Sequence, residues 1–133
     1  MSKHYASVAQ RAGYRCEYCH APEAIFNLPF EVEHILPTAR GGVDDPSNLA
    51  LSCRSCNLYK SDRQFAPDEL TASVVRLFNP RQDHWDEHFL AVPNDDMIQG
   101  LSQIGRATVI CLRFNRESQR EARRSWMRLG LFP

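Results

Sequence analysis

The chain has 133 residues, of which 43% are hydrophobic and 24% are charged, so its size and composition are those of a single globular domain. Its 16 basic and 16 acidic residues give a net charge of zero at pH 7, which as a whole-chain number argues against nucleic acid as a partner. The longest largely hydrophobic run, residues 107–112, is far shorter than the roughly 20 residues that cross a bilayer, so no membrane span is predicted. Because the N-terminal residues lack the apolar core of a secretion signal, we expect a cytoplasmic protein.

Five cysteines carry the first specific signal. Four of them form two Cys-x2-Cys pairs, Cys16 with Cys19 and Cys53 with Cys56, which are separated by 33 residues. A two-residue gap lets both sulfurs of a pair face one point, so the two pairs supply four thiolates for tetrahedral zinc; redox-active pairs are the alternative. With four protein ligands no position is left for water or substrate, so the predicted zinc site is structural. The fifth, Cys111, lies in the hydrophobic run and is expected to be buried.

Hydrophobic periodicity and turn residues predict the elements of the first half. They are a helix over residues 4–12 ended by Gly13, a strand over 30–35 ended by Pro37, a turn-rich loop over 38–47, a strand over 48–52 and a helix from Ser55 to Arg63. Apolar and polar residues alternate along the first strand, as is typical of a half-buried strand. The second helix places Asn57 and Lys60 on one face, at positions i and i+3. The expected unit is strand, loop, strand and helix, with zinc at its base.

The second half is less regular. Its expected elements are a helix over residues 71–78 ended by Asn79-Pro80, a hairpin formed by 85–92 and 97–101, and helices over 104–112 and 116–129. We therefore expect an α+β protein with a core in residues 1–64 and a hairpin-and-helix extension in residues 65–133. The extension is expected to pack on the core as one compact unit.

An ordered string of motifs runs through the predicted core. It consists of Glu33-His34-Ile35-Leu36-Pro37, then Gly41-Gly42, then Asn48-Leu49, then Cys53-x2-Cys56-Asn57-x2-Lys60. In this order the motifs resemble the HNH endonuclease family over residues 12–63. The resemblance implies a ββα-metal core, similar to a treble clef, that is pinned by a zinc site of four cysteines.

The resemblance also implies roles for four residues. His34 corresponds to the general base, and an imidazole suits proton removal near neutral pH. Glu33 and Asn57 correspond to the ligands of one catalytic cation, and their oxygen donors favour Mg²⁺ or Mn²⁺. Asn48 corresponds to a residue that fixes the loop by hydrogen bonds. Because adjacent residues on a regular strand point to opposite faces, the strand must end or twist at Glu33-His34 for both to serve one phosphate.

Basic residues near these motifs are candidates for contacts with DNA, which we expect to be double-stranded. Arg40, Lys60 and Arg63 are the candidates in the core, and a solvated basic face is the alternative. Residues 66–103 carry a net charge of −5, whereas residues 104–133 carry +5. Arginines recur there at every fourth position: Arg116, Arg120, Arg124 and Arg128. This row predicts either a rail for the DNA backbone or a solvated face with Glu–Arg pairs.

Two functions remain open at this point. The first is a metal-dependent DNA endonuclease, which Glu33, His34 and Asn57 together favour. The second is a non-catalytic, zinc-stabilised module that binds nucleic acid. A homodimer and a complex with a partner protein are both left open.

Overall fold

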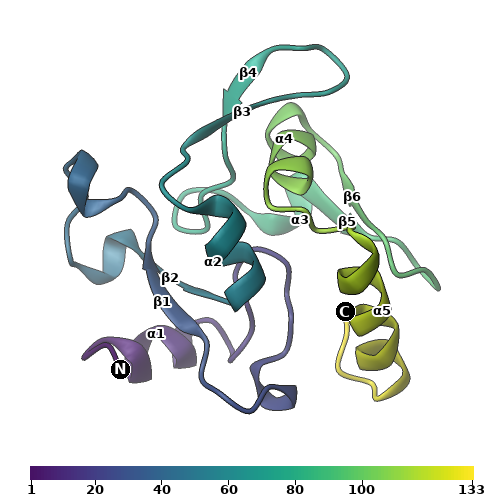
Figure 1. Ribbon diagram of the computed structural model, residues 1–133, viewed down its shortest axis with the longest axis horizontal. Helices are drawn as coiled ribbons and strands as arrows, with labels where there is room; N and C mark the ends of the chain where they lie inside the picture. The colour runs from purple at the N-terminus through teal and green to yellow at the C-terminus, as the bar shows by residue number, and fades with distance from the viewer.

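The elements of the first half surround a two-stranded antiparallel sheet, as a computed structural model of residues 1–133 shows (Figure 1). The helices and strands are α1 (Tyr5–Arg11), β1 (Glu31–His34), β2 (Leu49–Ser52) and α2 (Arg54–Lys60), and the loops contain the short 3-10 helices η1 (Glu23–Ile25), η2 (Thr38–Arg40) and η3 (Pro46–Asn48). In the β1–β2 pair Glu33 lies opposite Ala50 and His34 opposite Leu49. α1 packs against both strands and α2 packs against β1. The predicted unit of strand, loop, strand and helix is confirmed.

The ends of the two helices follow from their capping residues. The Cys53 side chain caps α2 by accepting a hydrogen bond from the backbone N–H of Cys56. This N–H is one of the groups that have no partner within the helix at its first turn. α2 ends at Lys60 rather than at Arg63, because Ser61 has a φ of 50° and leaves the helical conformation. Gly13 follows α1 with a φ of 63°, a conformation that glycine adopts without steric cost.

The second half contains two more antiparallel pairs and three helices. They are β3 (Phe65–Pro67), β4 (Val74–Arg76), α3 (Trp85–His88), β5 (Phe89–Ala91), β6 (Ile98–Gly100), α4 (Gln103–Cys111) and α5 (Glu117–Arg128). The two predicted helices near the C-terminus are confirmed as α4 and α5, and the predicted hairpin is confirmed as β5–β6. Residues 85–88, expected as the start of its first strand, form a helical turn instead.

The helix expected over residues 71–78 is wrong. Val74 and Val75 lie in β4, which pairs with β3 so that Val75 is opposite Ala66. Ala72 has a φ of 64°, which a right-handed helix cannot contain. The physical reason is that β-branched valines fit a pleated strand well. Residues 65–67 supply the partner strand, which the periodicity of residues 71–78 alone does not show.

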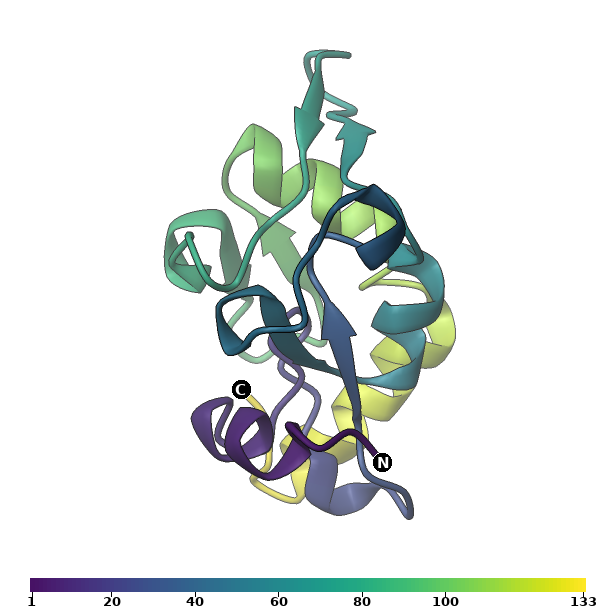
Figure 2. The same cartoon turned by 90° about the vertical axis from the view of Figure 1, so that its left-hand side faces the viewer.

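Buried side chains of both halves form one hydrophobic cluster. The indole N–H of Trp85 donates to the backbone carbonyl of Tyr18 at 2.8 Å. The rings of Phe26 and Trp126 lie 6.1 Å apart. Cys111 is half-buried at the end of α4 rather than fully buried. The β3–β4 hairpin extends beyond the rest of the molecule in the side view (Figure 2). None of the helices has the length and apolar character that a membrane span needs.

Candidate functional site

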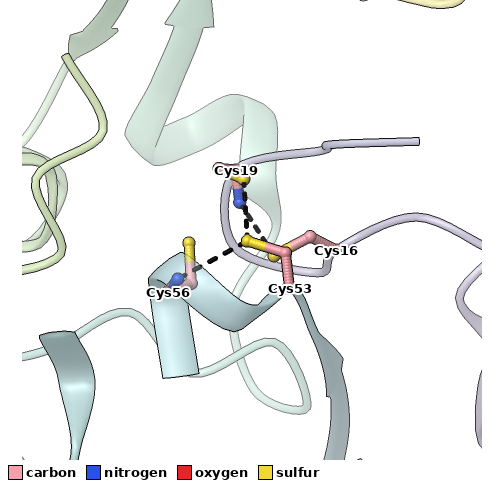
Figure 3. Close-up of side chains that lie close together, drawn as sticks. All are labelled: Cys16, Cys19, Cys53 and Cys56. Atoms are coloured by element: carbon pink, nitrogen blue, oxygen red, sulfur yellow. Dashed lines mark hydrogen bonds between the residues drawn. The ribbon is translucent and has the colours of Figure 1, made fainter. Parts of the chain in front are cut away.

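Four buried cysteines meet between the turn that follows α1 and the start of α2. The sulfur atoms of Cys16, Cys19, Cys53 and Cys56 all lie within 4.8 Å of one another (Figure 3). The Sγ atoms of Cys19 and Cys53 are 3.7 Å apart, close to the roughly 3.8 Å edge of a tetrahedron with Zn–S bonds of about 2.3 Å. The residues therefore fit a tetrahedral zinc ion.

The chemistry of this cluster also points to a cation. None of the cysteines forms a disulfide. Burial raises the pKa of the Cys56 thiol, because a buried thiolate loses its hydration. Four thiolates in one buried site need a compensating positive charge, which a bound Zn²⁺ would supply.

Two acidic side chains of β1 face α2. Glu31 and Glu33 point to the same side of the strand because side chains alternate with a period of two. The Asn57 amide donates a hydrogen bond to Glu31, and the Lys60 ammonium lies 3.3 Å from Glu33 Oε2. Asn57 and Lys60 thus share one helix face as predicted, but that face is turned to β1.

The Glu33 carboxylate is enclosed by protein donors. Glu33 is 6% exposed and Lys60 is 2% exposed. Tyr18 donates its hydroxyl hydrogen to Glu33 Oε1, while the Lys60 ammonium contacts Oε2 and donates to the Ile35 carbonyl at 3.0 Å. Burial raises the pKa of the Glu33 carboxyl, and the nearby Lys60 charge opposes that rise.

These contacts correct two expectations. Lys60 does not reach the surface, so it is not presented to DNA; its charge is held inside the protein by its ion pair with Glu33. Glu33 and Asn57 do not form an open oxygen site for Mg²⁺ or Mn²⁺, because both Glu33 oxygens are bonded and Asn57 contacts Glu31 instead. The residues expected to hold a catalytic cation therefore do not fit it in this arrangement.

His34 has a different set of partners, across the loop that joins β1 to β2. Its Nε2 lies 3.0 Å from Asp44 Oδ1. His4 approaches the other oxygen of the same carboxylate, with Nε2 3.5 Å from Asp44 Oδ2. A hydrogen bond from His34 lowers the pKa of Asp44, so the carboxylate stays ionised next to the imidazole.

The strand ends at His34, as expected from the sequence. The partners of Glu33 and His34 nevertheless belong to different parts of the fold, α2 for Glu33 and the loop for His34. The imidazole bonds to Asp44, whereas Glu33 bonds to Tyr18 and Lys60.

Asn48 fixes the same loop through three hydrogen bonds. Its Oδ1 accepts from the Leu36 N–H at 2.9 Å, and its Nδ2 donates to the Leu36 carbonyl at 2.9 Å and to the Val43 carbonyl at 3.0 Å. Gly42 lies against the same carbonyl, where any Cβ would overlap the Leu36 oxygen. Together these residues hold the loop that carries Asp44 close to the end of β1.

Sequence reasoning did not find Asp44, Glu31 or His4 as members of the site. Asp44 lies in a loop rich in turn residues, where an acidic residue has no spacing signal. Glu31 shares the alternation of β1 with Glu33, so the pattern alone did not decide which of the two meets Asn57. His4 precedes α1 and reaches Asp44 only through the tertiary fold.

The remaining arginine candidates divide by their partners. Arg40 pairs with Asp62 at 3.4 Å on the surface. Arg63 is exposed and donates to the Tyr59 carbonyl at 2.7 Å. In the predicted rail, Arg120 and Arg124 both contact the buried Asp96. The prediction of a continuous rail of free cations is therefore wrong, because the two central arginines are bound to Asp96.

No curated protein and no solved structure matches the chain at a significant level. A family model does match the part of the chain that contains β1, β2, α2 and the four clustered cysteines. Residues 16–63 match the model of the HNH endonuclease family, so this segment is similar to an HNH endonuclease domain.

Proposed function

We propose that this protein is an endonuclease that hydrolyses phosphodiester bonds in double-stranded DNA, with His34 as the general base. The HNH match over residues 16–63 supports nuclease-type chemistry. The observation that carries the proposal is the contact between His34 and the Asp44 carboxylate within that segment. A histidine that is held by a carboxylate and remains partly exposed is suited to proton transfer.

The Asp44 contact determines which nitrogen of His34 accepts the proton. An ionised carboxylate only accepts hydrogen bonds, so Nε2 carries the hydrogen that Asp44 receives. Nδ1 is then left unprotonated and takes a proton from the attacking water. The water oxygen forms a bond to phosphorus, and the bond from phosphorus to the leaving sugar oxygen breaks. The sugar oxygen keeps the electron pair of that bond and takes a proton from solvent water. The resemblance implies Mg²⁺ or Mn²⁺ as the cofactor.

The direct test is the nicking of supercoiled plasmid by the zinc-loaded protein in the presence of Mg²⁺ or Mn²⁺. We expect His34→Ala to lower the rate by about 10²-fold to 10⁴-fold, the range for loss of a general base. The matched control is His84→Ala, since His84 is exposed and lies outside residues 16–63. Circular dichroism checks that both variants fold. Equal nicking by the wild type and His34→Ala would contradict the mechanism.

Asp44 provides a second, finer test. Asp44→Asn removes the charged acceptor that orients His34. We expect kcat to fall by about tenfold with little change in KM, because the carboxylate orients the base and stabilises the charge that the base gains in the transition state, without contacting the substrate. The control is Asp86→Asn, an exposed aspartate outside the site. A change in KM alone would assign Asp44 to DNA binding instead of to positioning.

The burial of Glu33 favours one other candidate function. Its carboxylate is bonded to Tyr18 and Lys60 and is not open to a cation, which suits a zinc-stabilised module that binds nucleic acid without cleaving it. Such a module binds duplex DNA but leaves supercoiled plasmid intact with every divalent cation tested. Nicking that depends on His34 excludes it.

A further inference from the structure

Three arginines contact Tyr59 on α2, two at its ring and one at its backbone carbonyl. The guanidinium carbon of Arg113 lies 4.4 Å from the centre of the Tyr59 ring, and that of Arg116 lies 5.2 Å from it. Arg63 donates to the Tyr59 carbonyl at 2.7 Å. We call Arg63, Arg113 and Arg116 the Tyr59 arginine patch. It joins the end of α2 to the connection between α4 and α5, which Figure 1 shows beside each other.

The patch arginines have no carboxylate partner, whereas most other arginines of residues 65–133 do. The exceptions are Arg123, which is buried, and Arg128. Arg76 pairs with Asp83, Arg106 with Asp68, and both Arg120 and Arg124 with Asp96. No carboxylate forms an ion pair with any of the three patch arginines, and all three are exposed. The patch is therefore a place where positive charge is not neutralised within the protein.

The surroundings of Tyr59 hold these charges in place. The negative face of an aromatic ring attracts a guanidinium, so Tyr59 orients Arg113 and Arg116 at the surface. Arg63 and Arg113 line one groove, while Arg113 and Arg116 line a second. Three like charges around one residue repel one another, and a bound anion offsets that repulsion. Guanidinium groups match phosphate oxygens through paired N–H donors.

We propose that the Tyr59 arginine patch binds the phosphate backbone of double-stranded DNA. This inference rests on the proposed function and extends its DNA contacts beyond the matched segment, because Arg113 and Arg116 lie outside residues 16–63. The patch also replaces the predicted rail. Of the four rail arginines, Arg116 is the one that belongs to it, whereas Arg120 and Arg124 are occupied by Asp96.

The test measures DNA binding separately from cleavage. Fluorescence anisotropy measures the affinity for a labelled duplex at several salt concentrations. The duplex has about 20 base pairs, which is long enough for several phosphate contacts. All proteins carry His34→Ala so that the duplex is not cleaved. The variant is Arg113→Gln/Arg116→Gln, and the matched control is Arg124→Gln/Arg128→Gln, which removes the same charge from α5. A second variant, Arg113→Lys/Arg116→Lys, keeps the charge. Melting temperatures verify that each protein folds.

We expect the slope of log K against log salt to become shallower by about 0.9 for each phosphate that the protein no longer neutralises. The Gln double variant should therefore neutralise about two fewer phosphates than the wild type, the control should keep the slope, and the Lys variant should keep most of it. An unchanged slope for the Gln variant, or an equal decrease in the control, overturns the proposal. If the wild type does not nick plasmid but the Gln variant still shows the shallower slope, the proposed nuclease activity fails while the patch stands.

Discussion

Cys53→Ser is expected to release zinc and to unfold the segment that matches the HNH family. Cys53 lies in the four-sulfur cluster and also caps α2. Serine is itself a good N-cap residue, so this change preserves the cap while removing one metal ligand. Structural zinc contributes about 10–16 kcal/mol of apparent binding free energy in zinc-finger peptides, which is comparable to the whole stability of a small domain, about 5–15 kcal/mol.

Zinc content and thermal unfolding measure this result. The wild type should hold about one zinc ion per chain, as a site of four thiolates does, and should unfold cooperatively. Cys53→Ser should hold much less zinc and show no cooperative transition. Cys111→Ser is the control, because Cys111 is half-buried and outside the cluster. A zinc-free Cys53→Ser protein that melts like the wild type would refute a structural role for the metal.

The core could be predicted because its signals are local. The two cysteine pairs have fixed spacings, and β1 shows its alternation within a few residues. The loop-fixing role of Asn48 is implied by the HNH resemblance. In each case the residues that carry the signal are close in sequence or belong to one ordered motif. Such patterns can be recognised from the sequence alone.

The partners of the charged residues could not be predicted in the same way. A lysine on a short helix is expected in solvent, yet Lys60 is buried because Glu33 and the Ile35 carbonyl meet its ammonium group. Arg120 and Arg124 show a clear four-residue spacing, but the buried Asp96 that binds them comes from the β5–β6 hairpin loop. These pairs depend on how separate elements pack, and neither periodicity nor composition contains that information.

Removing either member of the Glu33–Lys60 pair is expected to destabilise the protein strongly. Both side chains are almost fully buried and lie 3.3 Å apart. Glu33→Gln leaves the Lys60 ammonium without a counter-charge, and Lys60→Met leaves the Glu33 carboxylate in the same state. Loss of one partner of a buried ion pair costs about 3–5 kcal/mol. Urea unfolding at pH 7 measures each change.

The double variant Glu33→Gln/Lys60→Met distinguishes a true pair from two separate effects. Glutamine still accepts the hydrogen bond from Tyr18, and no unpaired charge remains, so the double variant should be more stable than either single variant. The control is Glu31→Gln, since Glu31 lies on the same face of β1 but is half-buried and pairs with the exposed Arg54. It should change the stability by less than about 1 kcal/mol. Additive effects of Glu33→Gln and Lys60→Met would mean that the two side chains are apart in solution, which would leave the Glu33 carboxylate free to serve as the metal donor that the HNH resemblance implies.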